Sequence, residues 1–130
     1  MIDAYLQHEA ERKAQGIPAK PLDPEQTREV CKLLEAPPAG VEALLRGLLE
    51  NRVSPGVDPA AEVKAAFLAD VVKGARRSPL VSRKDAVRLL GTMYGGYNVA
   101  PLVVALSDPE LADEAARGLA ATTQVYDAFD

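Results

Sequence analysis

The stretch VEALLRGLLE at residues 41–50 decides the expected fold, because its apolar residues repeat with the period of an α-helix. The residues at i, i+3, i+4, i+7 and i+8 are Val41, Leu44, Leu45, Leu48 and Leu49. This spacing places all five side chains on one face of a helix, where they can pack against a neighbouring element. The stretch therefore predicts an amphipathic helix that buries one side.

The same spacing recurs on both sides of this stretch. It is found in two further sets, Thr27, Val30, Cys31 and Leu34 before it, and Val99, Leu102, Val103 and Leu106 after it. Apolar residues make up 48% of the 130 residues, aromatic residues make up 5%, and Trp is absent. Because Ala and Leu favour helices and no segment shows sustained two-residue alternation, an all-α fold is expected.

Helix starts are marked by capping residues. Asp-Pro pairs occur at 23–24, 58–59 and 108–109. Asp can accept a hydrogen bond from a free N–H of the first turn, and Pro suits the first helical position. Ser82 with Asp85 resembles a capping box, and Asn98 is expected to cap a sixth helix. The predicted helices span residues 2–15, 24–36, 41–52, 59–73, 83–94, 99–107 and 109–127.

The joints between these helices are short, so neighbouring helices are expected to form antiparallel hairpins. Pairing the second helix with the third, the fourth with the fifth and the sixth with the seventh gives hairpins that start at residues 24, 59 and 99. This pitch is close to the ~40–47 residues of HEAT and armadillo units. We expect one all-α domain over residues 1–130, a HEAT-like array of about seven helices. An irregular helical bundle is the alternative.

Composition and charge narrow the functional classes. The formal net charge of −4 and the low sequence pI argue against a surface that binds nucleic acid or anionic lipid as a whole. The single cysteine, Cys31, excludes an internal disulfide and fits a reducing compartment, so a cytoplasmic location is expected. The first residues lack a signal-peptide pattern, and no stretch approaches ~18 consecutive apolar residues, so no membrane partner is expected.

Residue types that carry catalysis or metal binding are scarce. Cys31 lies on a predicted apolar face and is expected to be buried and unreactive, with a reactive thiol as the alternative. His8 is expected on the surface of the first helix, without a partner for acid–base chemistry. One Cys and one His cannot supply the three thiolates of an iron–sulfur cluster. The sequence therefore predicts no catalytic, cofactor-binding or metal-binding residue in this chain.

The glycine-rich segment GTMYGGYN at 91–98 lies between two predicted helices. Gly95 and Gly96 are expected to form a tight structural turn, because Gly adopts positive φ without steric penalty, and Asn98 belongs to the same turn. Phosphate binding by backbone N–H groups is the alternative, but the segment follows a helix and lacks the P-loop spacing. Tyr94 and Tyr97 are candidates for a contact surface.

Charge is distributed unevenly along the chain. Residues 73–88 carry six cations against one acid, and residues 105–130 carry six acids against one cation. The favoured interpretation is a solvated loop and helix end, and the functional alternative is a docking pair, or an anion or RNA site at the basic end. The candidate interaction residues are Arg76, Arg77, Arg83, Lys84, Arg88, Tyr94 and Tyr97. RNA is a less favoured partner because no aromatic residue interleaves the cations.

Five stretches, taken in order, resemble the start of the bacterial aconitate hydratase B family. They are AERKAQGIPAKPLD at 10–23, LLEAPPAG at 33–40, LLENRVSPGVDPAAEVKAAFLADVVKG at 48–74, SPL at 78–80 and LLGTMYGGYNVAPLV at 89–103. The resemblance covers essentially the whole chain. Its most specific part is NRVSPGVD followed by LLGTMYGGYN.

This resemblance implies properties that periodicity does not show. Members of the family place a HEAT-like helical domain first, then a swivelling domain, then domains around a [4Fe–4S] cluster. The cluster interconverts citrate and isocitrate through cis-aconitate, and the enzymes also act as 2-methylisocitrate dehydratases. The cluster cysteines belong to the far C-terminal part, so none corresponds to Cys31. The HEAT-like domain is associated with dimerisation, the route to the active site and a switch to an mRNA-binding form.

Two functions are therefore weighed. The first is an N-terminal protein-interaction domain of a longer aconitase chain, inactive by itself, whose partners are the remaining domains and a second subunit. The second is an independent helical-repeat adaptor that binds another protein. The apolar face of the last helix continues from Leu111 to Phe129, and this uncapped end favours a fragment of a longer chain.

Overall fold

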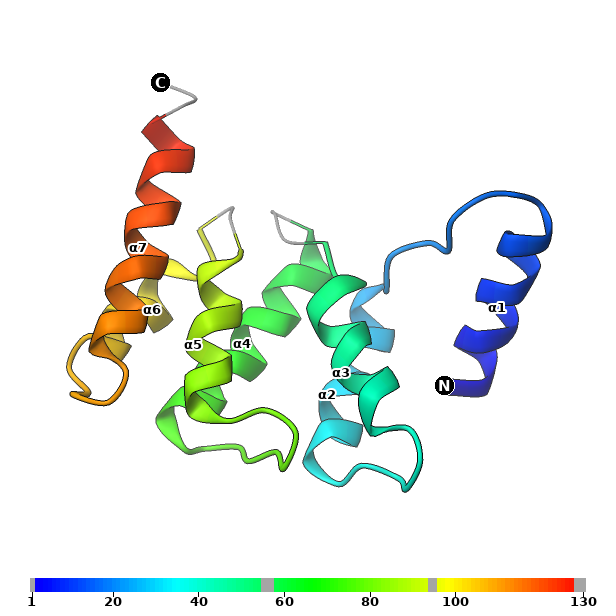
Figure 1. The fold of residues 1–130 in the computed structure, drawn as a ribbon, viewed down its shortest axis with the longest axis horizontal. Helices are drawn as coiled ribbons and strands as arrows, with labels where there is room; N and C mark the ends of the chain where they lie inside the picture. Colours follow the sequence, from blue (N-terminus) through cyan, green and yellow to red (C-terminus); the bar gives the residue numbers. More distant parts are fainter. Residues whose placement is uncertain (1, 55–57, 94–95, 128–130) are drawn as a thin grey trace.

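Seven α-helices make up the described part of the chain. The computed structural model describes residues 2–54, 58–93 and 96–127 (Figure 1). The helices are α1 (Ile2–Ala14), α2 (Pro24–Glu35), α3 (Glu42–Asn51), α4 (Pro59–Lys73), α5 (Arg83–Gly91), α6 (Val99–Ala105) and α7 (Ala112–Asp127). These residues contain no strand, so the all-α prediction is confirmed.

Three of the predicted helix starts are capped as expected. The Asp23 side chain accepts a hydrogen bond from the N–H of Gln26, whose side chain in turn accepts from the N–H of Asp23. Asp58 accepts from a backbone N–H in the first turn of α4. Ser82 and Asp85 form the predicted capping box at α5. Each cap satisfies a backbone donor that the helix itself leaves unpaired, which stabilises the helix by about 1 kcal/mol.

Two predicted boundaries differ from the structure by three residues, and one predicted cap is not formed. The last helix begins at Ala112, because Asp108 closes a separate turn in which its Oδ1 accepts from the N–H of Glu110 at 2.9 Å. α5 ends at Gly91, earlier than predicted. Asn98 does occupy the N-cap position of α6, but the prediction that its side chain caps this helix is wrong, since that side chain makes no cap hydrogen bond.

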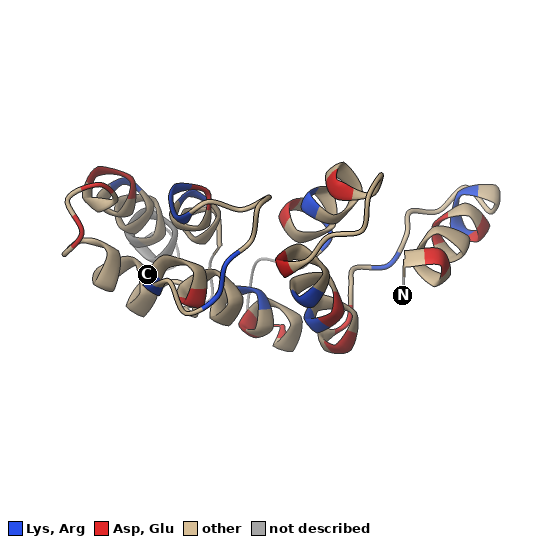
Figure 2. Cartoon of the chain, turned by 90° about the horizontal axis from the view of Figure 1, so that it is seen from below, with Lys and Arg blue, Asp and Glu red and all other residues tan. Residues whose placement is uncertain are grey.

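The six helices from α2 to α7 form three hairpins. α2 contacts α3, α4 contacts α5, and α6 contacts α7. Between hairpins, α2 contacts α4, α4 contacts α6, and α5 contacts α7. Figures 1 and 2 show α3, α5 and α7 in one layer and α2, α4 and α6 in a second layer behind it. The core lies between the layers and includes the fully buried side chains of Val30, Leu34, Leu45, Leu68 and Leu90.

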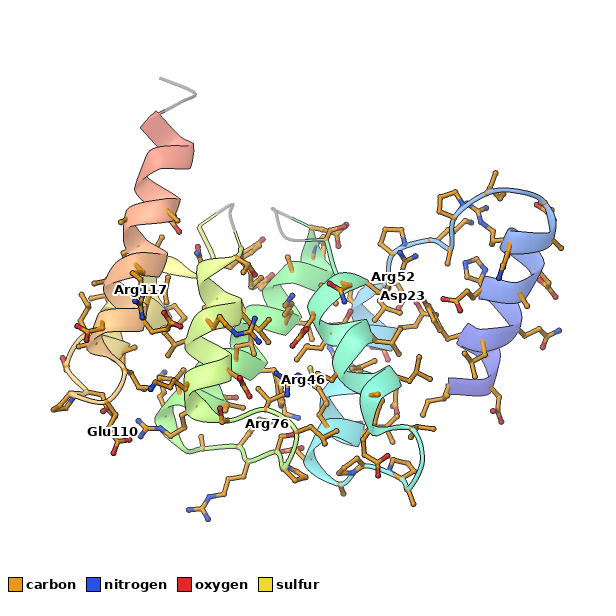
Figure 3. The ribbon with its side chains drawn as sticks, in the orientation of Figure 1. Asp23, Arg46, Arg52, Arg76, Glu110 and Arg117 are labelled. Atoms are coloured by element: carbon orange, nitrogen blue, oxygen red, sulfur yellow. The ribbon has the colours of Figure 1, made fainter. Side chains whose placement is uncertain are left out.

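α1 lies at one end of the row, beside the hairpin of α2 and α3 (Figure 1). Its Tyr5 is buried, and Arg52 Nε donates a hydrogen bond to the Tyr5 hydroxyl at 3.1 Å. The same guanidinium donates to the carbonyl of Ala19, and the Arg52 carbonyl accepts from the N–H of Leu22 at 2.8 Å. Arg52, labelled in Figure 3, therefore ties α1 and its linker to the end of α3.

Candidate interaction surface

The basic segment predicted at 73–88 covers the loop between α4 and α5 and most of α5. α4 ends at Lys73, and its C-cap Gly74 has a φ of +79°, a left-handed conformation that favours glycine. The Gly74 N–H donates to carbonyls of the last turn of α4, so the chain turns sharply there. This turn places the following residues on the edge of the molecule, beside the end of α2.

Arg76 turns from this loop towards α2. Its Nε and Nη2 each donate to a carboxylate oxygen of Glu35 at 3.0 Å. Its guanidinium carbon lies 4.8 Å from the centroid of the Phe67 ring. The hydrogen bond from Arg76 lowers the pKa of the Glu35 carboxyl. A bidentate arginine that also stacks on an aromatic ring holds the loop against α2, so Arg76 has a structural contact inside the chain.

Arg83 connects the basic segment with the acidic one. Its Nε donates to the carbonyl of Val72 at 2.9 Å, and its Nη2 donates to Asp108 Oδ2 at 2.6 Å. The hydrogen bond from Arg83 lowers the pKa of the Asp108 carboxyl. The two segments that the sequence presents as a docking pair therefore contact each other, at this point, within one chain.

Arg88 also lies close to acids of the same chain. Its Nη2 is 3.4 Å from Glu50 Oε1 and 3.9 Å from Asp85 Oδ1. Arg46 from α3 contacts the same two carboxylates, at 3.0 and 3.5 Å. Figure 3 shows Arg46 on the side of α3 that faces α5. These ion pairs bridge the two helices, although partly exposed pairs of this kind contribute little stability.

Besides Lys73 at the end of α4, the exposed cations of this segment that remain are Arg77 and Lys84. Neither forms an ion pair with a residue in the described part of the chain. A pocket of about 350 Å³ opens in this loop, and the polar side chains that line it are Arg76, Arg77, Ser78, Ser82 and Arg83. We call residues 74–84 the basic loop. It presents two uncompensated positive charges beside a pocket.

The glycine-rich turn is described only in part, since Tyr94 and Gly95 lie outside the described residues. Gly96 has a φ of +99°, a left-handed conformation suited to glycine. Tyr97 is half-buried and packs against the hydrophobic core. The turn is therefore anchored to the core through the residue that follows Gly96.

Asn98 links this turn to two helices. Its side chain is fully buried, and Nδ2 donates to the carbonyls of Leu90 and Met93, both at 2.9 Å. Nδ2 also lies 3.0 Å from the Oγ1 of Thr122, which in turn donates to the carbonyl of Gly118. Sequence reasoning missed Thr122 because the pair is 24 residues apart and no local spacing marks it.

The two residues considered for catalysis, Cys31 and His8, both have structural environments. Cys31 is buried, and this burial raises the pKa of its thiol to about 12, which disfavours the reactive thiolate. His8 is half-buried, contrary to the prediction of a solvated side chain. Its Nε2 accepts a hydrogen bond from the N–H of Lys20 at 3.1 Å, which joins α1 to the linker.

The amino-acid sequence matches, over residues 4–130, a family model described as the aconitate B N-terminal domain. The chain belongs to this family. The resemblance found in the ordered motifs is therefore confirmed over almost the full length.

Relatives of this aconitate B N-terminal domain are much longer proteins. The chain is 53% identical to aconitate hydratase B of Pseudomonas aeruginosa and 52% identical to that of Escherichia coli, each over 129 residues. It is 48% identical to aconitate hydratase B of a Synechocystis strain over 132 residues. The matches cover 99–100% of this chain and 15% of each relative. The chain thus spans about 15% of the length of the curated relatives it matches.

The described ranges of this aconitate B N-terminal domain contain neither a group of metal ligands nor a membrane-spanning helix. Over the described ranges, no three His, Cys, Asp or Glu side chains are grouped so that they could hold a metal ion. Its only cysteine is the buried Cys31, so its residues do not fit the [4Fe–4S] cluster that the family resemblance implies. No helix within those ranges is long and apolar enough to cross a membrane.

Proposed function

We propose that this chain is the N-terminal protein-interaction domain of an aconitate hydratase B, and that it serves dimerisation, access to the active site and regulation. The observation that carries the proposal is the family match over residues 4–130, combined with relatives of which the chain covers 15%. In the complete enzyme, other domains would carry the [4Fe–4S] cluster and the interconversion of citrate and isocitrate. The partners are these domains and a second subunit, with RNA as the less favoured partner.

We propose further that α2 to α7 form a HEAT-like array. The support is the pairing of consecutive helices into three hairpins and the contacts of α2 with α4, α4 with α6 and α5 with α7. Arrays of this kind expose extended surfaces formed by several repeats, and each repeat contacts mainly its neighbours. Such a surface suits a domain that works by contacting other domains.

We propose the basic loop as one docking element. Arg76, Arg83 and Arg88 are already paired with acids of this chain, whereas Arg77 and Lys84 are exposed and unpaired among the described residues. Within the basic loop, the charges available to an acidic surface of another domain or subunit are therefore those of Arg77 and Lys84, and Lys73 at the end of α4 is a third exposed cation beside the loop. Complementary charges of this kind raise association rates and fix the register of docking more than they add affinity.

A domain exchange tests the proposed function. This chain replaces the N-terminal domain of aconitate hydratase B from Escherichia coli, to which it is 52% identical, and a second protein lacks that domain altogether. We expect the chimera to sediment like the parent enzyme and to hydrate cis-aconitate at a similar rate, whereas the deletion protein is impaired in one or both. A chimera that behaves like the deletion protein would instead favour an independent adaptor.

Charge reversal in the chimera tests the basic loop. Arg77→Glu with Lys84→Glu is expected to weaken subunit association or domain docking at low ionic strength. The difference should fade at high salt, because exposed charges are screened within ~8 Å at physiological ionic strength. Lys13→Glu with Lys20→Glu, two exposed cations at the α1 end, is the matched control. If both double variants associate equally in sedimentation velocity at low salt, the basic loop is ruled out as a docking element.

A further inference from the structure

α6 is apolar around its whole circumference. Residues 99–106, which cover α6 and its C-cap, read VAPLVVAL and contain no polar side chain. Leu102 and Ala105 are buried against neighbouring helices, at 0% and 1% exposure. Val103 at 51% and Val104 at 49% are exposed on the opposite side, and Leu106, the C-cap residue, is 42% exposed at the end of the helix. Helices that are apolar on all sides belong in protein interiors, so the exposed side of α6 calls for a covering element.

These side chains form the densest apolar surface of the described chain. Over residues 2–54, 58–93 and 96–122, five large apolar residues are exposed, and three of them lie between positions 103 and 106. The other two, Leu6 and Ile17, belong to α1 and the linker that follows it. In Figure 2 the α6 ribbon carries no charged residue, whereas α5 and α7 carry both signs. We call Val103, Val104 and Leu106 the α6 face.

The position of α6 in the row shows where a covering element would fit. In the layer of α2, α4 and α6, α2 contacts α4 and α4 contacts α6, so α6 is the last helix of its layer. α7 runs antiparallel to α6 and extends well past its start (Figure 1). A helix that reversed direction after α7 would return alongside α6 and continue the layer.

We propose that the α6 face is covered, in the complete protein, by the first helix of the polypeptide that follows residue 130. The inference rests on the proposed function, because it takes the chain to be the N-terminal domain of a longer protein. Its support is that the matched family is an N-terminal domain and that relatives continue over the remaining 85% of their length. The covering helix presents apolar side chains to Val103, Val104 and Leu106.

A second copy of this chain fits the α6 face less well. α6 has seven residues and is therefore only about 10 Å long. Stable interfaces between separate chains bury about 1,200–2,000 Å², which is far more than three side chains provide. A helix on the same polypeptide needs much less contact area, because its attachment keeps its effective concentration high.

Hydrogen exchange in the complete protein tests this inference. Val103→Lys with Val104→Lys should accelerate amide exchange across residues 99–107 about tenfold or more, because the lost contacts stabilise α6 locally. The sedimentation coefficient should not change, since the contact lies within one polypeptide. Ala116→Lys with Ala120→Lys, at exposed positions on α7, is the matched control and should leave exchange over residues 99–107 unchanged. Val103→Ala with Val104→Ala repeats the test if the charged variant does not fold.

Two results would overturn the inference. Unchanged exchange in both Val103 and Val104 variants would mean that no element covers the α6 face. A fall in sedimentation coefficient with unchanged exchange would assign the face to a second copy. Either result leaves the proposed function intact, because that function is judged by the domain exchange and by variants of Arg77 and Lys84.

Discussion

Two junctions join the three hairpins, and their side chains differ in length and charge. At the first junction, between α3 and α5, Arg46 and Arg88 reach the same carboxylate of Glu50 at 3.0 and 3.4 Å. At the second junction, between α5 and α7, the backbones approach so closely that a Cβ on Gly118 would lie 2.9 Å from the Cα of Gly91. Long charged side chains span the gap at the first junction. At the second junction the helices meet directly, because Gly91 and Gly118 have no side chains.

The groups beneath each junction differ in the same way. Lys64 of α4 is buried at the first junction, near Cys31 of α2 and Glu50 of α3. At the second junction the buried polar groups are the neutral side chains of Asn98 and Thr122. The first junction should therefore respond to pH and salt, whereas the second should respond to side-chain size and hydrogen bonding.

Removal of the Asn98 side chain should have the largest effect. Asn98→Ala is expected to lower the free energy of unfolding by about 2–4 kcal/mol, because a lost buried hydrogen bond costs about 1 kcal/mol and a buried carbonyl left without a donor costs about 1–3 kcal/mol. The carbonyl that loses its donor is that of Met93, whereas the carbonyl of Leu90 keeps the N–H of Met93 as a donor at 3.1 Å. Chemical denaturation measures the change. Thr122→Val is the control, since it leaves both carbonyls paired with Asn98 and should cost about 1 kcal/mol. Equal losses in the two variants would show that Asn98 does not hold the second junction.

Lys64 should make the first junction sensitive to alkaline pH. Burial lowers the pKa of Lys64 from 10.5 to about 8, although Glu50 opposes this shift. Between these values the unfolded chain binds a proton that the folded chain has lost, so stability rises with pH in this window. Below about pH 8 the folded protein keeps a buried ammonium, and Lys64→Met should then raise the free energy of unfolding by about 2–3 kcal/mol.

The stabilising effect of Lys64→Met should disappear towards about pH 10, where the wild-type side chain is neutral in the folded state. Urea denaturation across this range tests the prediction. Both proteins should carry Cys31→Ala, because the raised pKa of Cys31 lowers stability as pH rises above its ordinary value of 9.0. A constant difference between the two proteins at every pH would show that Lys64 does not titrate in this window.

Two glycines should respond to alanine with opposite signs. Gly118→Ala is expected to destabilise by about 1–2 kcal/mol, because overpacking against Gly91 outweighs the ~1 kcal/mol gain in helix propensity. Gly47 lies within α3 and a Cβ there would meet nothing within 4 Å, so Gly47→Ala should stabilise by about 0.5–1 kcal/mol. Thermal or chemical unfolding compares the two variants. Effects of the same sign would mean that close backbone contact does not define the second junction.

The ion pairs of the first junction should give the smallest effect. A double-mutant cycle with Arg88→Ala and Glu50→Ala is expected to yield a coupling energy of about 0.2–1 kcal/mol, because the Arg88 side chain is 46% exposed. The coupling should decrease at high salt. A larger coupling that salt does not change would mean that this pair is shielded from water and that the first junction resembles the second.

The sequence predicted the helices well because their signals are local. The caps formed by Asp23, Asp58 and Ser82 bond residues only two or three positions away, and their patterns are therefore visible in the sequence. The predicted turn at Gly96 also depends on one residue's own φ. Asp108 misled the prediction because the same local signal also fits an isolated turn, and α7 begins only at Ala112.

By itself, the sequence determined the all-α class, the capped helix starts and the excess of positive charge at 73–88. Only the tertiary structure decided which of those charges remain available. Arg76 pairs with Glu35 across 41 residues of sequence, and Arg83 pairs with Asp108 across 25. The physical reason is that a helix start depends on neighbours within one turn, whereas an ion pair between hairpins depends on how those hairpins pack. The spacing of residues within either segment does not show how the hairpins pack. Arg77 and Lys84 could therefore be identified as unpaired only after the hairpins were in place.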